Sequence, residues 1–379
     1  MAAEVIVIGG GPAGLSAAIG LHRSGLEVRV LEQRVAWQER VCGGFINPEG
    51  VTHLRWLGLL DRLHAASAVP VGCSALTLPG GRTGTVPIGR RGVVGLGVSR
   101  RTLEAILLEA AVAAGCEVSL GARAVDVRRD GDRWLVAVRI QGLREETIEA
   151  DLVVLADGRF SRGVHPVPAR VRRGWFGWNA TFVGVSQAPG ELSMHFYPRG
   201  YVGVLTFADG ETNVCGLTWL EEGESRRWET VWTEATDGQP SLQRLMKTAR
   251  RVSEWRGVGP LPFTRAMRAS DGPLLAGDAA AVGDPYMGEG ISRALGTGPI
   301  VHRALAEVGG KRPDAGAVGR TYSRIWRRRY TSRLRLGTLV RALQERPALF
   351  HAGLGLLLRQ PESLHVLSRV FHPVSASLD

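Results

Sequence analysis

Lysine and cysteine are both scarce in this chain. The 47 basic residues include only two lysines, Lys247 and Lys311, so 45 of them are arginine. The cysteines form no Cys-x-x-Cys pair, so a zinc site or a disulfide framework is not expected, and no metal is predicted. The four cysteines are widely spaced, at Cys42, Cys73, Cys116 and Cys215.

Long apolar runs are absent as well. No stretch reaches the roughly 18 consecutive apolar residues that a membrane-spanning helix requires. Residues 1–4 lead directly into an apolar strand, without the pattern of a signal peptide. These absences predict a cytoplasmic protein with reduced thiols. The net charge of +11 favours acidic partners, but no basic segment is interleaved with aromatic residues, so nucleic-acid binding is not expected.

The chain has enough apolar residues for a substantial core. Its 379 residues are 44% hydrophobic and 22% charged, which is ordinary for a globular protein. A length of this order favours about two domains of about 150 residues each.

A nucleotide-binding pattern opens the chain. Residues 4–8, EVIVI, form a short apolar run that is typical of a buried parallel strand. Gly9, Gly11 and Gly14 follow as Gly-x-Gly-x-x-Gly, in which the glycines permit a tight turn, the approach of a pyrophosphate and close helix packing. The next strand ends at Glu32, 18 residues after Gly14, where an acid binds the ribose of an adenosine. This order predicts a dinucleotide site but does not distinguish FAD from NAD.

Two later segments extend this pattern. An apolar strand ends at Asp157-Gly158, and a short strand much later ends at Gly277-Asp278. A glycine-rich turn and a helix start follow at residues 288–291. The carboxylate can bond a polyol, and the helix start can direct N–H groups at an electron-rich ring edge. The sequence therefore predicts a second nucleotide-type contact on the same fold.

Together these motifs resemble those of the FAD-dependent oxidoreductases with the aromatic-hydroxylase (p-hydroxybenzoate hydroxylase-like) fold, over residues 3–310. The segment Cys-Gly-Gly at residues 42–44 and the pattern Arg-x-x-Leu-Glu at residues 100–104 are similar to the geranylgeranyl reductase-related subgroup. The resemblance implies an α/β protein with a Rossmann-type FAD-binding domain, an inserted antiparallel-sheet substrate domain and a C-terminal helical tail.

The resemblance also implies a discontinuous domain organisation. The expected parts are an FAD-binding domain at residues 1–70, 97–165 and 271–310, a substrate domain at residues 71–96 and 166–270, and a C-terminal helical region at residues 311–379.

The resemblance assigns FAD contacts to individual positions. The glycine-rich turn is implied to hold the pyrophosphate, Glu32 the adenosine ribose, and Asp278 the ribityl chain, while residues 288–291 border the pyrimidine edge of the flavin. Solvation is the alternative for the two arginines of the set, and core packing is the alternative for Val125. The implied FAD contacts are Gly9, Gly11, Pro12, Ala13, Gly14, Glu32, Gln33, Arg40, Cys42, Gly43, Gly44, Arg100, Val125, Asp157, Gly158, Gly277, Asp278, Pro285, Gly288, Glu289, Gly290 and Ile291.

The chain changes character between residues 165 and 270. Strand patterns separated by turn residues are typical of an antiparallel sheet, and residues 242–255 then predict a helix. A sheet inserted between two FAD motifs would cover the flavin ring, and its many aromatic residues suit a hydrophobic organic substrate, such as an isoprenoid, a quinone or a polyketide. Ordinary core packing is the alternative for each of them. The candidates for the substrate pocket are Trp178, Phe196, Tyr201 and Phe207.

Two departures from related flavoproteins narrow the substrate. Geranylgeranyl reductases carry an aromatic-Trp-Phe-Pro pattern on this sheet, whereas residues 200–210, GYVGVLTFADG, lack it, which argues against a long isoprenoid. Flavin-dependent halogenases use a lysine in the first part of the chain, but the first lysine here is Lys247. Residues 174–178, GWFGW, also do not fit their Trp-x-Trp motif. Halogenation is therefore disfavoured.

The chemistry stays open between two flavin reactions. Reduction or dehydrogenation of a carbon–carbon bond by hydride transfer is favoured, and NAD(P)H-dependent hydroxylation of an aromatic or polyketide-like substrate is the alternative. A non-catalytic flavin-binding protein is a third class. No second dinucleotide fingerprint is present, so NAD(P)H is expected to bind transiently, if it is the donor. Cys42 is the candidate catalytic residue, with substrate steering and space filling as alternatives.

The C-terminal region predicts helices interrupted by prolines at Pro347, Pro361 and Pro373. Residues 320–346 are arginine-rich and residues 348–358 are largely apolar. We expect a helical cap on the flavin domain, with peripheral contact to an anionic membrane as the alternative. The sequence does not indicate an oligomeric state.

Overall fold

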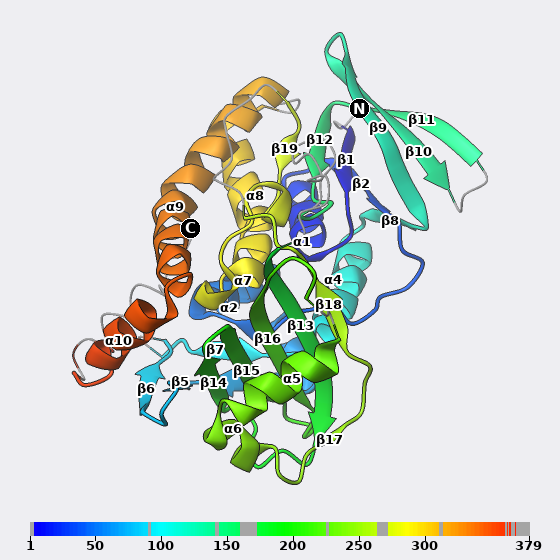
Figure 1. Cartoon of the computed structure of the whole chain (residues 1–379). Coiled ribbons are helices and arrows are strands. Elements are labelled where there is room, and N and C mark those ends of the chain that lie inside the picture. The colour runs from blue at the N-terminus through cyan, green and yellow to red at the C-terminus, as the bar shows by residue number, and fades with distance from the viewer. Residues whose placement is uncertain are drawn as a thin grey trace.

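The computed structural model describes residues 4–89, 92–140, 144–159, 173–224, 227–263, 272–310 and 314–360, together with residues 362, 364 and 368. Figure 1 shows two lobes, with the N-terminal strands and the long C-terminal helix in one lobe and the strands of the middle of the chain in the other. No helix within these ranges is long and apolar enough to cross a membrane.

A five-stranded parallel sheet forms the centre of the first lobe. Its strands come from distant parts of the chain. The last of them in sequence, β19, lies at one edge of the sheet. This sheet confirms the predicted Rossmann-type core. The strand order is β19 (Leu274–Leu275), β12 (Leu152–Leu155), β1 (Glu4–Ile8), β2 (Glu27–Glu32) and β8 (Glu117–Leu120).

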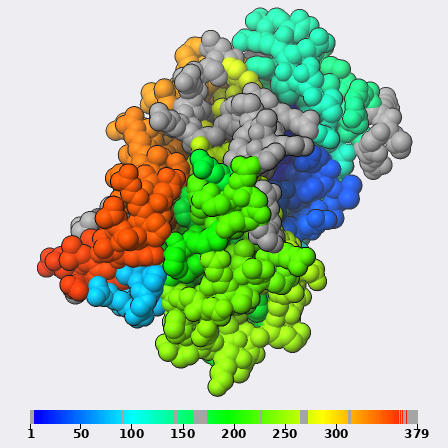
Figure 2. All heavy atoms as spheres, viewed as in Figure 1, coloured from blue at the N-terminus to red at the C-terminus, as the bar shows by residue number. Residues whose placement is uncertain are grey.

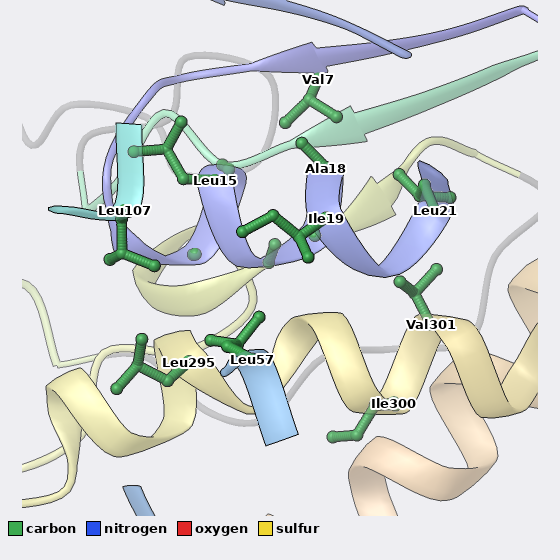
Figure 3. Packing of buried hydrophobic residues seen from close by; sticks show 14 of the residues in the cluster. Val7, Leu15, Ala18, Ile19, Leu21, Leu57, Leu107, Leu295, Ile300 and Val301 are labelled. Atoms are coloured by element: carbon green, nitrogen blue, oxygen red, sulfur yellow. The ribbon is translucent and has the colours of Figure 1, made fainter. Parts of the chain in front are cut away.

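Helices cover one face of the parallel sheet. Val7 of β1 faces α1, and α1 in turn packs on α8, whose Val301 side chain points toward α1 (Figure 3). The run of small residues in α1 permits this close two-sided packing, and every residue from Pro12 to Leu21 is buried. The helices of this layer are α1 (Pro12–Arg23), α4 (Arg100–Ala113), α7 (Gly290–Leu295) and α8 (Thr297–Val308).

A three-stranded antiparallel sheet covers the other face. Ile6 and Ile8, which alternate with the helix-facing residues of β1, pack against Trp134 and Val136 of this sheet. The apolar run of β1 is therefore buried on both sides, as its sequence predicts. The strands are β9 (Ala122–Asp130), β10 (Arg133–Ile140) and β11 (Arg144–Ala150).

An eight-stranded sheet forms the second lobe. All neighbouring strands are antiparallel except β5 and β14, which are parallel, so the inserted sheet differs from the prediction at this one pair. The strands are β5 (Cys73–Thr77), β6 (Thr83–Pro87), β13 (Gly174–Val183), β14 (Leu192–Tyr197), β15 (Gly200–Thr206), β16 (Thr212–Leu220), β17 (Arg250–Arg251) and β18 (Arg256–Val258).

Two helices, α5 (Trp228–Asp237) and α6 (Pro240–Leu245), cover the outer face of this sheet. The predicted helix at residues 242–255 is correct only for residues 242–245, which form the end of α6. It ends at Leu245 because the following residues pair with the edge of β13, where the Val252 N–H donates to the Thr181 carbonyl at 2.8 Å. Edge pairing thus outweighs the helix propensity of this segment.

The remaining elements connect the two lobes. A small sheet combines β3 (Phe45–Ile46), β7 (Gly95–Gly97) and β4 (Val69–Val71). Helix α2 (Pro48–Leu57) precedes α3 (Leu60–Ala65). Helix α2 begins at Pro48, because the Asn47 side chain caps it by accepting from the Gly50 N–H at 3.0 Å.

The C-terminal chain forms two helices along the outside of the molecule. The 30-residue α9 (Ala315–Gln344) packs on α8, and α10 (Pro347–Leu357) lies against the β5–β6 hairpin (Figures 1 and 2). The Arg82 guanidinium donates to the Gly355 carbonyl at 3.0 Å. The predicted helical tail is therefore present in the described residues and contacts both lobes.

Candidate functional site

A large cavity lies where the carboxyl ends of the parallel strands meet the inner face of the eight-stranded sheet. Its volume is about 1540 Å³. The β1–α1 turn, the end of β2, the segment 155–159 and the segment 276–291 contribute to its wall. Ligands of open α/β sheets bind at this edge, where strand order reverses. The cavity is therefore the candidate site.

The predicted cofactor residues converge on this cavity. All of them line it except Gly14 and Gly44. A Cβ on Gly14 would lie 1.8 Å from the Gly9 carbonyl oxygen, so this glycine permits helix α1 to pack on the strand. Gly44 has a φ of +69°, and a Cβ there would lie 2.9 Å from the Phe207 ring. These two glycines lie behind the cavity wall and allow the backbone there to pack closely.

Three glycines leave open space in front of the backbone. A Cβ on Gly11, Gly158 or Gly290 would meet no atom within 4 Å, although all three residues line the cavity. Gly11 is the N-cap of α1, whose first N–H groups are available to a phosphate. Backbone from three separate segments therefore forms a cradle that fits a long dinucleotide with a flat ring.

The Glu32 carboxylate is held tightly at the end of β2. It accepts from the Gly10 N–H at 2.7 Å and from the Arg34 N–H and Nε at 2.9 and 2.8 Å. Burial opposes the charge, but the bonds from Arg34 outweigh it, so the pKa of Glu32 lies below its ordinary value. Arg34, which stacks on Trp37 at 4.4 Å, was not identified from the sequence. Glu32 is thus oriented at the cavity wall beside Gln33.

The two predicted arginines line the cavity from different elements. Arg100 begins α4 and bonds Glu104 through Nη2 at 2.7 Å, while its Nε has no partner among the described residues. Burial lowers the pKa of Arg40, and the neighbouring Arg34 acts in the same direction. Cys42 lies beside the Arg100 guanidinium, and its sulfur accepts from the Gly44 N–H at 3.4 Å.

Asp278 lies in the short helical turn η1 (Gly277–Ala279) that follows β19. Its carboxylate is 3.5 Å from Arg293 Nη2 and 3.7 Å from Arg159 Nε. Asp157 and Val125 line the same cavity, and Val125 is 42% exposed, so it does not belong to the core. The polar residues are thus brought together from strands far apart in sequence.

The glycine-rich turn continues into α7 through η2 (Pro285–Met287). Glu289 is buried and accepts from Arg333 of α9 at 2.9 Å. Arg333 also bonds Glu49 of α2 at 2.6 Å. Helix α9 therefore fixes the turn that carries Gly288, Gly290 and Ile291.

The part of the cavity that the eight-stranded sheet lines is an apolar chamber. Tyr201 of β15 lines it, as does Trp178 of β13, although the Trp178 indole packs edge-on against Trp232 and Trp255 on the outer side of the sheet. Phe196 and Phe207 lie in apolar clusters beside the chamber and are not among its lining residues. The apolar chamber is lined by Leu76, Val86, Leu192, Met194, Leu205, Leu217, Val258 and Leu261.

Sequence reasoning missed several lining residues. Cys215 lines the cavity, and a Cβ on Gly43 would lie 3.4 Å from its sulfur. Asp284 and Arg333 also contribute to the wall. The position of Asp284, directly before the predicted Pro285, was an available signal, whereas nothing local to α9 indicates that Arg333 reaches the site.

Known proteins resemble the chain over most of its length. It is 26% identical over 361 residues to the FAD-dependent monooxygenase OpS4 of Beauveria bassiana, covering 83% of this chain and 80% of that protein. It is 28% identical over 334 residues to menaquinone reductase of Mycobacterium tuberculosis, covering 80% and 76%. Reductases of geranylgeranyl groups are further relatives, which confirms the predicted resemblance.

The fold also occurs in a solved structure of the flavin-dependent brominase Bmp2. The TM-score is 0.77 at 20% identity, and the match covers 98% of this chain and 93% of that chain. At this identity the likeness supports the fold alone. The family model described as an FAD-binding domain matches residues 2–324, and this protein is an FAD-dependent oxidoreductase that belongs to the FAD-binding domain family.

Proposed function

We propose that this protein reduces a carbon–carbon double bond of a hydrophobic organic substrate of the quinone or isoprenoid class. The apolar chamber is the observation that carries the proposal, because aliphatic side chains form its wall and join it directly to the cofactor cradle. Bound FAD supplies the hydride chemistry. The chain supplies an apolar surface that places the substrate and excludes water.

Hydroxylation is the second candidate, because a relative is named a monooxygenase. In that reaction molecular oxygen would be consumed and one oxygen atom would enter the product. We infer that NAD(P)H, if it is the donor in either reaction, binds transiently at the cofactor cavity.

An anaerobic turnover experiment distinguishes the two reactions. The FAD-loaded protein is photoreduced without oxygen and mixed with prenylated quinones and polyprenyl compounds of different lengths. We expect reoxidation of the flavin together with a product that keeps two additional hydrogen atoms after exposure to air, because a quinone ring that was only reduced to the quinol would lose them again. Product that forms only after oxygen is added, with one additional oxygen atom, would establish hydroxylation and reject the proposal.

We also propose that the C-terminal helices contact an anionic bilayer. Leu349 and Leu356 of α10 are 58% and 59% exposed, and Leu339 and Leu343 of α9 are exposed on one helical face. Exposed arginines flank them at Arg335, Arg346 and Arg359. Exposed leucines beside cations suit the boundary of an anionic membrane.

The opposite side of α10 supports this assignment. Leu354 is buried in the cluster that contains Tyr201, and the Phe350 ring lies 6.1 Å from the Tyr286 ring. Helix α10 therefore covers the apolar chamber on one side while it exposes leucines on the other. A hydrophobic substrate could pass from the bilayer to the chamber beside this helix.

Leu356→Asp is expected to weaken binding to vesicles of anionic phospholipid by about tenfold or more, because burial of a leucine contributes about 1.5–3 kcal/mol. Co-sedimentation measures the bound fraction. Val112→Asp on α4, where Val112 is 55% exposed, is the matched control and should bind as the unchanged protein does. Equal binding of both variants, or no binding to any vesicle, would contradict membrane contact.

A further inference from the structure

Asp284 is a buried carboxyl group in the wall of the cavity. It immediately precedes η2 and is 5% exposed. Its Oδ1 accepts from the Tyr286 N–H at 2.9 Å, whereas its Oδ2 has no hydrogen-bond partner among the described residues. A buried polar atom without a partner is costly to a fold, so this oxygen at the cavity wall requires an explanation.

The surroundings of Asp284 are mostly apolar or aromatic. Gly337 of α9 packs behind it, since a Cβ on Gly337 would lie 3.5 Å from the Asp284 Cβ. Tyr201 and Tyr286 line the same part of the cavity, with ring centroids 5.9 Å apart. This wall joins the turn at residues 288–291 to the apolar chamber, so Asp284 lies between the two.

Few charged or titratable groups face Asp284. Arg341 of α9 acts on it from one side, and Arg293 of α7 lies beside the preceding residue, Gly283. Burial raises the pKa of Asp284 to about 6, while the Tyr286 N–H and Arg341 act in the opposite direction. Burial raises the pKa of both tyrosines above their ordinary value, so they are weaker acids than Asp284 near neutral pH.

We propose that Asp284 is the acid of the apolar chamber and gives its proton to the substrate. The proposal rests on the proposed function. As the π bond of the double bond breaks, one carbon accepts the Asp284 proton and the other would accept the hydride that bound reduced FAD supplies, so two C–H bonds form and the carbon–carbon single bond remains. A two-electron donor of the nicotinamide class would then return the oxidised cofactor to its reduced state. The Asp284 carboxylate recovers its proton from water.

Cys42 is the competing proton donor. Its sulfur lies beside the Arg100 guanidinium and accepts from the Gly44 N–H, so it belongs to the polar part of the wall. Asp284 adjoins the aromatic pair at the apolar chamber instead. Proton donation by Asp284 therefore predicts that Asp284→Asn is impaired, whereas donation by Cys42 predicts that Cys42→Ser is impaired.

Infrared spectroscopy of the protein without added substrate gives a readout that is independent of turnover. We expect a buried carboxylic-acid C=O band that is present at about pH 5, lost at about pH 8 and absent from Asp284→Asn at both pH values. A wild-type spectrum from which Asp284→Asn removes nothing would overturn the proposal. The FAD absorbance and thermal melting of the variant report whether it still folds and binds cofactor.

Stopped-flow reoxidation of the photoreduced, FAD-loaded protein by substrate tests the step itself. Asp284→Asn is expected to slow it by about 10²–10⁴-fold, the usual contribution of a general acid, and far more than Cys42→Ser does. Asp284→Glu should recover part of the rate, and Cys73→Ser, at an exposed cysteine outside the cavity, should retain it. Because only the protonated acid donates, the wild-type rate should fall as the pH rises above about 6, and Asp284→Asn should lose this dependence.

Failure of the role proposed for Asp284 and failure of the proposed reductase function give different results. An Asp284→Asn variant that reoxidises at the wild-type rate, or a Cys42→Ser variant that alone is impaired, overturns the role of Asp284 and leaves the reductase function intact. A wild-type protein that transfers no hydrogen to any compound under anaerobic conditions rejects the proposed function and this step together.

Discussion

Arg333→Met is expected to lower the free energy of unfolding by about 3–5 kcal/mol, the usual effect of removing one partner of a buried ion pair. Glu49 is 1% exposed and accepts from Arg333 Nη1 at 2.6 Å and from Arg329 Nε at 2.5 Å. Glu289 accepts from the same Arg333 guanidinium at 2.9 Å. The variant therefore removes part of the positive charge that balances the buried carboxylates of Glu49 and Glu289.

Chemical denaturation of the FAD-loaded protein measures the loss. The matched control is Arg335→Met, because Arg335 lies on the same helix but is exposed, and its change should be below about 0.5 kcal/mol. Adding Glu289→Gln to Arg333→Met should recover part of the loss, since a neutral amide replaces an unpaired charge. A decrease in the free energy of unfolding smaller than about 1 kcal/mol would show that the ion pairs of Arg333 with Glu49 and Glu289 do not hold α9 against the first lobe.

The ion pair between Arg333 and Glu289 is also expected to affect FAD binding. Glu289 directly precedes Gly290, which faces open space in the cofactor cradle. A displaced Glu289 would shift this turn, so Arg333→Met should weaken FAD binding as well as the fold. Helix α9, which the sequence predicts as a simple cap, thus contributes Arg333, Leu334 and Gly337 to the cavity wall.

The sequence was most informative where the chemistry is local. Gly9, Gly11 and Gly14 lie within one turn, and their roles follow from backbone geometry alone. Glu32 ends the next strand, at the point that such a motif requires. A short range of sequence therefore contains all the information needed to place these residues at one edge of the sheet.

Contacts between distant segments could not be predicted in this way. Glu49 and Arg333 are separated by 284 positions, and a charged residue in an arginine-rich helix is indistinguishable from its exposed neighbours. The segment after Leu245 has a helical pattern, yet the edge of β13 captures it as β17. In both cases tertiary pairing outweighs the local pattern, and a single sequence does not contain that pairing in readable form.

The role of Asp284 was only partly predictable from the sequence. The family resemblance implied that Pro285 contacts the cofactor, but an aspartate before a proline is also an ordinary turn residue. Only the folded structure shows that one carboxyl oxygen is bonded within the turn while the other has no partner among the described residues.

Gly11→Val is expected to weaken FAD binding by at least about 100-fold, equal to about 2.8 kcal/mol, without unfolding the protein. Gly11 has φ −78° and ψ −178°, an extended conformation that valine adopts readily. A Cβ at this position meets no protein atom within 4 Å, so the side chain enters the cavity rather than the core. There it would occupy the space in front of the α1 N-terminus that a pyrophosphate needs.

Absorbance titration with FAD measures the affinity, and thermal melting of the cofactor-free protein reports the fold. Gly72→Val is the matched control, because a Cβ on Gly72 also meets nothing within 4 Å, yet Gly72 does not line the cavity. The control should bind FAD normally, and both variants should melt near the cofactor-free wild type. Normal FAD binding by Gly11→Val would mean that the pyrophosphate lies elsewhere, and the orientation assigned to the whole cofactor would then be wrong.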